Sequence, residues 1–373
     1  MSREYDRPIA LALSGGGIRA MAFHLGVLKW MAERSLLEKV VRISTVSGGS
    51  LLTGLIYQSS NFQWPSSRHF LDETFPKVSE LLCTKSMQLG ALRMALRPRN
   101  WKFLMSRANL LARELIENWG MDVPLSVIPK KPEWSINGTT AENGKRFRFK
   151  GTEIGDWALG YAETPNFPLG CALAVSAAFP VGFGPLAIDP KDFEWRYGEW
   201  GTTPEDRKPV DIKYRRLHLY DGGLYDNLGA EPFFHPGTQK AKIAGDYVIV
   251  SDAGAPLAEG MDAGPLSPFR VKRLMDIVME QCRALRVRAF ANYLQRYPEA
   301  GALLIIGTRG LNETTADAAF AKSFDTSLKK LSRDEFDRLA NHGYAVAGAV
   351  ARDYGLCSEE RASGPTPDRL AAG

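Results

Sequence analysis

Ser47 is the residue in this sequence whose surroundings best fit a catalytic nucleophile. It lies in the stretch STVSGGS, residues 44–50, between a β-branched run and residues with helical spacing. A serine in a sharp turn between a strand and a helix projects its hydroxyl above the sheet, provided that its neighbours are small. Gly48 and Gly49 meet that condition, whereas Thr45 stands where the G-x-S-x-G motif has its first glycine. A helix N-cap serine is the structural alternative.

Three consecutive glycines, residues 15–17, form a second turn with chemical potential. They follow a short apolar run and open a helix, so their N–H groups lie at an electropositive helix N-terminus, which suits a phosphate or a developing oxyanion. The loose G-x-G-x-x-A pattern ending at Ala20 also fits a nucleotide-binding module. That module needs an acidic residue where the second strand ends, and this sequence has Thr45 there. Adjacent parallel strands would bring the glycine turn and Ser47 to one edge of the sheet.

An aspartate rather than a histidine is expected to activate the serine. Asp221 ends the apolar strand 217–220 and precedes two glycines, so its carboxylate is expected at the same edge as Ser47. A carboxylate within hydrogen-bond reach can accept the serine proton during attack. Asp252 also ends a strand and competes for this role, and a tight turn is the structural alternative for Asp-Gly-Gly. The contexts of all five histidines favour packing or surface roles: His24, His69, His218, His235 and His342.

The elements that position these residues are typical of an open parallel sheet. Residues 9–13 and 40–45 are predicted to be buried strands, and residues 19–34 and 50–57 have helical spacing. Strand, glycine turn and helix, repeated twice, predict a three-layer α/β/α fold with a mainly parallel central sheet. Later strands are expected at 135–137, 146–150, 217–220, 247–251 and 302–307, and a long amphipathic helix is expected at 268–293.

A helical insertion, a candidate lid or membrane-facing cap, is expected over residues 58–129. Within it, residues 85–113 contain seven basic residues and no acidic one, interleaved with leucine, methionine, phenylalanine and tryptophan and divided by Pro98. This composition fits an element lying on an anionic lipid surface, and a core-packing helix with a solvated basic face is the alternative. The residues expected at a lipid contact are Arg93, Arg97, Arg99, Trp101, Lys102 and Phe103.

The whole chain has the composition of an ordinary globular protein. Its 373 residues carry a net charge of +5, which favours a basic patch for an anionic surface and does not indicate a nucleic-acid partner. Four widely spaced cysteines argue against a disulfide scaffold or a zinc site. With no signal peptide and no apolar run of about 18 residues, the expected location is cytoplasmic with peripheral membrane contact. We expect one domain over residues 1–357 and a disordered tail over 358–373.

Four blocks of sequence, in this order, resemble the patatin-like phospholipases. The blocks are SGGGIR at 14–19, VSGGS at 46–50, SAAFP at 176–180 with the stretch to Pro185, and DGG at 221–223 with DNL at 226–228. The predicted strand pair within 137–149 also fits. The resemblance covers roughly residues 8–230, and the ordered set is more specific than any one block.

The resemblance implies a Ser–Asp dyad without histidine, with Ser47 as nucleophile and Asp221 as general base. The implied oxyanion hole comprises backbone groups and an arginine that fixes the loop or the substrate's anionic group: Gly15, Gly16, Gly17 and Arg19. The implied reaction is hydrolysis of a fatty-acyl ester of a phospholipid or lysophospholipid through an acyl-serine, without a metal or organic cofactor. Thr45 departs from the family's glycine two residues before the serine. A catalytically weak lipid-binding protein with the same fold is therefore the alternative.

Overall fold

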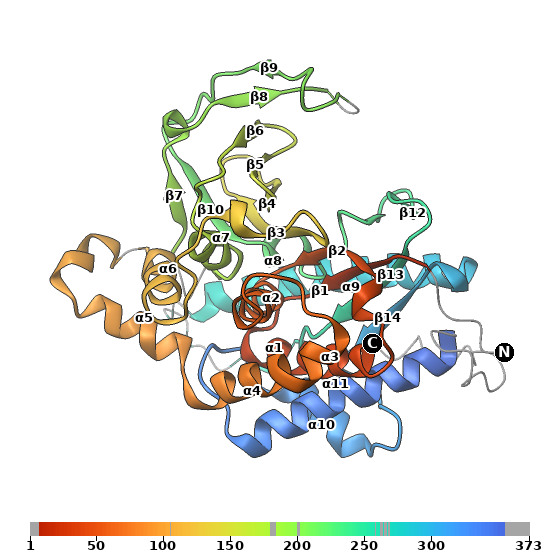
Figure 1. The fold of residues 1–373 in the computed structure, drawn as a ribbon. Coiled ribbons are helices and arrows are strands. Elements are labelled where there is room, and N and C mark those ends of the chain that lie inside the picture. Colours follow the sequence, from red (N-terminus) through yellow and green to blue (C-terminus); the bar gives the residue numbers. More distant parts are fainter. Residues whose placement is uncertain are drawn as a thin grey trace.

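The protein is described here from a computed structural model, which covers residues 7–104, 106–179, 184–199, 202–257, 259–261, 264, 267 and 269–354. A central sheet lies between two layers of helices (Figure 1), which confirms the predicted α/β/α fold with a mainly parallel central sheet. The expected tail over 358–373 and residues 180–183 of the third family block lie outside the described residues.

The parallel part of the sheet contains the five predicted strands, four with limits close to those predicted and β3 longer than the predicted 135–137. Leu13 of the first strand faces Thr45 of its neighbour on one side and Ser251 on the other, so these strands end level with one another. The turns that follow them therefore lie at one edge of the sheet. In spatial order the strands are β14 (Gly301–Ile305), β13 (Tyr247–Asp252), β1 (Ile9–Leu13), β2 (Val40–Thr45) and β3 (Glu133–Thr140).

Strand β1 is buried on both faces because its side chains alternate between two cores. Ile9 and Leu11 face a core shared with one helical layer, whereas Ala10 and Ala12 face a second core that includes Phe290. The first layer contains α1 (Gly17–Ala32), α2 (Gly48–Ser59), α4 (Phe75–Thr84) and α11 (Arg333–Tyr354), and the second contains α9 (Phe269–Arg296).

Strand β10 (Leu217–Asp221) meets the end of β2 along the same edge of β3. β2 pairs with β3 in parallel as far as Thr45 opposite Ile136, and β10 pairs with β3 antiparallel from Thr140 back to Gly138, opposite Asp221. The other edge of β3 is occupied by β4 (Arg146–Lys150). Since β2 and β10 run toward each other along one edge, the residues that follow β2 and those that end β10 come together.

Beyond β4 the sheet continues as an antiparallel extension that lies at the top of Figure 1. Its further strands are β5 (Glu153–Asp156), β6 (Gly160–Glu163), β8 (Trp195–Tyr197) and β9 (Lys208–Pro209), while β7 (Leu186–Ile188) pairs with β10. A separate two-stranded sheet contains β11 (Phe234–His235) and β12 (Lys240–Ala241). Short helices complete the described fold: η1 (Leu37–Lys39), α7 (Leu169–Ser176), η5 (Pro190–Asp192), α8 (Gly223–Asp226), η6 (Pro298–Ala300) and α10 (Thr315–Ser323).

The described part of residues 58–129 is helical, and its two halves lie differently. α4 packs against α1, α2 and α11, whereas α5 and α6 project at the left of Figure 1. The helical path is interrupted before Pro98: α5 ends at Ala95, and Arg97 is extended, as expected for the residue that precedes a proline. None of the helices formed by described residues is long and apolar enough to span a bilayer. Besides α4, the elements are α3 (Ser67–His69), η2 (Phe70–Thr74), α5 (Met87–Ala95), η3 (Pro98–Phe103), α6 (Arg107–Asn118) and η4 (Leu125–Val127).

Candidate active site

Ser47 forms the sharp turn between β2 and α2. Its backbone has φ 50° and ψ −117°, a region that non-glycine residues occupy only under tight constraint. Its N–H donates to both Oγ and O of Ser176, each at 3.1 Å. Its hydroxyl makes no capping hydrogen bond with α2, so the N-cap alternative does not describe this serine.

Asp221 lies opposite this turn, at the end of β10, and is only 2% exposed. Its carboxyl accepts the Gly223 N–H at 2.7 Å. Burial raises the pKa of Asp221 to about 7, although the Gly223 N–H and the neighbouring Ser47 side chain lower it. The structure thus brings together the serine and the aspartate that the sequence analysis singled out. The carboxyl changes its charge near neutral pH.

The segment 176–178, at the end of α7, holds the backbone of both residues. Ser176 accepts the Ser47 N–H, and two residues later Ala178 O accepts the Asp221 N–H at 3.1 Å. Thr139 Oγ1 donates to Asp221 O at 2.9 Å. This segment includes the start of the third family block, and it fixes the positions of two residues that are far apart in the chain.

The glycine turn after β1 lies directly against Ser47. A Cβ atom on Gly15 would lie 3.1 Å from Ser47 Cβ and 2.4 Å from Asn227 Oδ1, so a side chain has no room there. The Gly15 N–H donates to Asn227 O at 3.0 Å and is therefore already used. Within the described residues, the N–H groups of Gly16, Gly17 and Gly48 have no acceptor, and a Cβ on Gly48 would meet Gly17 O. Within the described residues, these three N–H groups next to Ser47 are therefore unused.

Arg19 faces the protein interior and binds the structure around the turn. Its Nε and Nη2 donate to Ala253 O at 3.1 and 3.0 Å, and its Nη1 donates to Phe324 O. Burial lowers the pKa of Arg19 to about 10, a value at which the guanidinium stays charged at neutral pH. Of the two roles that the resemblance implies for it, these bonds suit fixing the loop. The neighbouring Ile18 N–H donates to Ser327 O at 2.7 Å.

Asp252, the competing base, has other partners. It forms an ion pair with Arg283 of α9 and accepts the Gly254 N–H at 2.9 Å. The histidines also have other partners: His24 with Ser251 and Ser14, His69 with Glu73, His218 with Glu142, His235 with Thr238, and His342 with Glu313 and Ile306. Burial lowers the pKa of His24 to about 4, so it is neutral at pH 7.

The residues predicted to contact lipid divide into two groups. Trp101, Arg93 and Lys102 are exposed, but Phe103 is half-buried against the core. Arg97 and Arg99 are exposed and both pair with Glu117, which α6 brings to them from outside the basic segment. The apolar part of this surface is larger than predicted, because four leucines are also exposed: Leu89, Leu92, Leu96 and Leu104.

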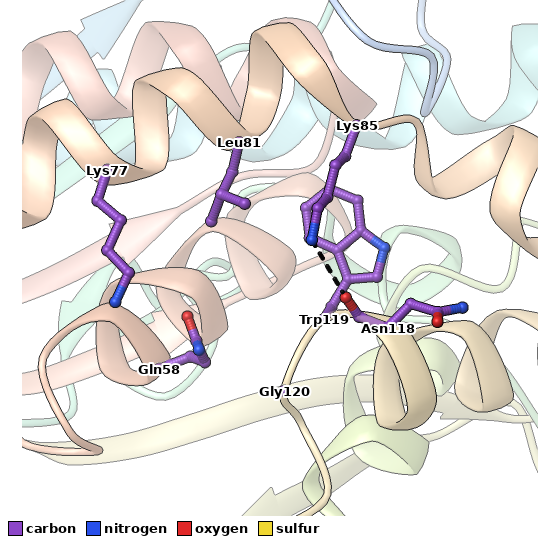
Figure 2. A pocket seen from close by; sticks show the side chains of 7 residues that line it. All are labelled: Gln58, Lys77, Leu81, Lys85, Asn118, Trp119 and Gly120. Atoms are coloured by element: carbon purple, nitrogen blue, oxygen red, sulfur yellow. Dashed lines mark hydrogen bonds between the residues drawn. The ribbon is translucent and has the colours of Figure 1, made fainter.

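This exposed surface is connected to the glycine turn through residues 327–328. The Gln88 N–H, at the start of α5, donates to Leu328 O at 3.0 Å. The preceding residue, Ser327, accepts the Ile18 N–H directly after the glycines. A cavity of about 260 Å³ lies elsewhere, between α2, α4 and the end of α6, and is lined by Lys77, Lys85 and Trp119 among others (Figure 2). Neither Ser47 nor Asp221 lines that cavity.

Several residues that build the site were not predicted to do so. Ser176 and Asn227 lie in the family blocks, but their backbone contacts depend on distant pairing. Nothing in the sequence around Ser327 indicates that its carbonyl accepts the Ile18 N–H. Gly48 could have been named as an oxyanion donor, since the residue after a nucleophile at a strand–helix turn often supplies such an N–H.

Comparisons with known proteins agree with the fold and with the sequence blocks. A sequence model of the patatin-like phospholipase family matches residues 11–234, more than half of the chain, and no curated protein sequence gives a significant match. The structure of human GIVD cytosolic phospholipase A2 is similar over 94% of this chain, with a TM-score of 0.52 and 15% identity. Its complex with methyl gamma-linolenyl fluorophosphonate and terbium chloride is similar over 94% of this chain, with a TM-score of 0.53 and 15% identity.

The chain spans 59% of the human protein in the first of these structures and 58% in the second. At this identity the structural similarity concerns the fold alone, whereas the family model matches the stretch that contains the glycine turn, Ser47 and Asp221. The chain belongs to the patatin-like phospholipase family.

Proposed function

We propose that this protein is a lipid acyl hydrolase that cleaves fatty-acyl ester bonds through an acyl-Ser47 intermediate. Membership of the family supports lipid acyl hydrolysis at a general level. The observation that carries the specific proposal is the placement of Ser47, held in a strained turn, beside the buried carboxyl of Asp221, whose pKa the Ser47 side chain lowers. A base with a pKa of about 7 suits proton transfer near neutral pH.

In the first step, Ser47 Oγ forms a bond with the ester carbonyl carbon while its proton passes to the Asp221 carboxylate. The carbonyl oxygen becomes an oxyanion, which the free N–H groups of Gly16, Gly17 and Gly48 are available to bind. The ester C–O bond then breaks, and the leaving oxygen takes the proton from Asp221. The product alcohol departs and the acyl group stays on Ser47.

In the second half of the reaction, water replaces the alcohol. Its proton passes to Asp221 as its oxygen attacks the acyl carbon, and the second oxyanion faces the same N–H groups. The bond between the acyl carbon and Ser47 Oγ breaks, the free fatty acid leaves, and the proton returns to Ser47. Protons and electrons balance over the cycle without a further reactant.

The proposed substrate is a phospholipid or related lipid ester at an anionic membrane surface. The support is the projecting surface of α5 and η3, where Leu92 is 64%, Leu96 is 77% and Trp101 is 60% exposed. Arg93 and Lys102 lie among these residues, so the surface combines apolar side chains with positive charge. Its link to the glycine turn through residues 327–328 would bring the membrane close to the dyad.

Substitution of the two dyad residues tests this function. Ser47→Ala and Asp221→Asn should each lower hydrolysis of p-nitrophenyl butyrate by at least about 1000-fold, since each removes a group that takes part in bond making. Ser59→Ala replaces another buried serine, at the far end of α2, and should leave the rate unchanged. A fluorophosphonate should label Ser47, as located by mass spectrometry. Full activity of Ser47→Ala would overturn the proposal.

The same experiment separates the catalytically weak lipid-binding protein from the hydrolase. That alternative predicts vesicle binding without any labelling of Ser47 or any hydrolysis. It relied on Thr45, whose side chain is buried and hydrogen-bonded away from the glycine turn, to Trp134 and Ser50.

A further inference from the structure

Thr45, the residue that departs from the family motif, has a buried hydroxyl with two donors. Trp134 Nε1 donates to Thr45 Oγ1 at 2.9 Å, and Ser50 Oγ donates to the same oxygen at 2.8 Å. The Trp134 indole is itself held by stacking on Tyr57, with 5.1 Å between ring centres. A glycine at position 45 would leave the indole N–H and the Ser50 hydroxyl without this acceptor.

The bonded hydroxyls continue from Thr45 to the backbone of the nucleophile. The hydroxyl oxygens of Ser50 and Ser176 lie 2.8 Å apart. Because Ser50 gives its one proton to Thr45, Ser176 Oγ is the donor in this contact, and it shares its proton between Ser50 Oγ and Asn137 O at 2.7 Å. Ser176 Oγ also accepts the Ser47 N–H at 3.1 Å. The three hydroxyl-bearing residues are all fully buried, so water does not compete for these bonds. We call this set, Thr45, Ser50 and Ser176, the hydroxyl network.

The network acts on a backbone that needs external support. With its φ of 50°, Ser47 stays in place only if the surrounding structure over-determines its conformation. Its N–H has both acceptors on Ser176, and one of them is the network's hydroxyl. Because Ala178 holds the backbone of Asp221, a shift of Ser47 relative to Ser176 is also a shift relative to its base.

We propose that Ser176 is a positioning residue for the nucleophile and that the Thr45 hydroxyl, acting through Ser50, fixes the orientation of Ser176. On this view the missing glycine does not weaken the turn, because its replacement supplies a bond that a glycine cannot make. The inference rests on the proposed function, since it assumes that Ser47 is the nucleophile. Neither Ser176 nor Thr45 needs to touch the substrate.

The test compares variants that remove a hydroxyl with one that keeps it. Ser176→Ala should lower both the rate of fluorophosphonate labelling of Ser47 and kcat on p-nitrophenyl butyrate by about 10- to 100-fold. Thr45→Val, which keeps the shape and loses the hydroxyl, should lower both by about 3- to 10-fold. Thr45→Ser, which keeps the hydroxyl, should stay within about 2-fold of wild type. KM should change by less than about 2-fold in all three, because the substrate contacts are intact.

Three further readouts keep structural effects apart from positioning. Rates are expressed per folded molecule, the melting temperature is measured for each variant, and Ser59→Ala serves as the control for loss of a buried serine outside the network. If Ser176→Ala and Thr45→Val only lower the melting temperature and react at the wild-type rate, the inference is overturned and the proposed function stands. A Thr45→Ser variant as slow as Thr45→Val would overturn the part assigned to Thr45. If wild-type Ser47 is not labelled at all, the proposed function and this inference fail together.

Discussion

Replacing Asp221 with asparagine should make the protein more stable at alkaline pH while it removes the proposed base. The carboxyl is buried beside Ser47, and burial raises its pKa from 3.8 to about 7. The folded protein therefore binds this proton more tightly than the unfolded chain does. Asparagine keeps the Oδ1 acceptor for the Gly223 N–H but never has to carry a charge in this buried place.

The size of the effect follows from the difference between the two pKa values. The contribution of Asp221 to stability is fully present below pH 3.8 and is lost as the pH rises to about 7, because over that range the carboxyl ionises only in the unfolded chain. Each pH unit in this range is worth about 1.36 kcal/mol. From pH 5 to pH 8 the wild type should lose about 2 to 3 kcal/mol of unfolding free energy relative to Asp221→Asn, most of it below pH 7.

Urea denaturation of both proteins at half-unit steps from pH 5 to pH 8.5 measures this difference directly. Asp337→Asn, at an exposed aspartate of α11, is the control: it shows how removal of a surface carboxyl changes the unfolding free energy over the same pH range. The wild-type kcat/KM should fall below about pH 7 as Asp221 becomes protonated. If the unfolding free energies of the wild type and of Asp221→Asn differ by the same amount at every pH, the reasoning is refuted, because the pKa of the carboxyl would then be the same in the folded and unfolded protein.

Two other predictions concern the competing aspartate and the projecting surface. Asp252→Asn should destabilise the fold by about 1 to 3 kcal/mol, as the nearly buried Arg283 loses a charged partner, yet keep esterase turnover per folded molecule. An inactive Asp252→Asn beside an active Asp221→Asn would mean that the base is wrongly assigned. Leu92→Ser combined with Leu96→Ser and Arg93→Gln should weaken sedimentation with anionic vesicles by about 10-fold or more, without changing hydrolysis of soluble esters. Val127→Ser, at an exposed apolar residue of η4, is the matched control. If binding to anionic vesicles is insensitive to both salt and the triple substitution, this surface does not contact the membrane.

The parallel part of the fold could be predicted because its signals are local. β1 is a short apolar run and β2 is rich in β-branched residues, both end at glycine or serine turns, and α1 has apolar residues at helical spacing. α11 was not among the predicted elements, although its buried residues Phe336, Leu339, Val346 and Val350 have the same kind of spacing. The strands from β5 to β9 escaped prediction because they are short, and β8 and β9 are largely exposed, which weakens any alternation.

The site itself could be predicted only in part, because most of its geometry depends on contacts between distant residues. The resemblance to the family pointed to Ser47 and Asp221, and the structure places the Ser47 side chain near enough to lower the pKa of Asp221. No local pattern could show that the Asn227 carbonyl accepts the Gly15 N–H. Nor could it show that Glu117 pairs with two of the arginines predicted to contact lipid. The role of Thr45 was equally hidden, since Trp134 reaches it from the neighbouring strand.

The anchoring of the glycine turn by Ser327 has a consequence for the order in which the protein is made. Ser47 leaves the ribosome early, Asp221 follows much later, and the residue that accepts the Ile18 N–H comes later still. A nascent chain or an N-terminal fragment therefore has the reactive serine long before the turn beside it is held in place. Under the proposed function, a chain that ends before Asp221 and Ser327 lacks both the base and the anchor of the glycine turn, so lipid cleavage requires nearly all of the described residues.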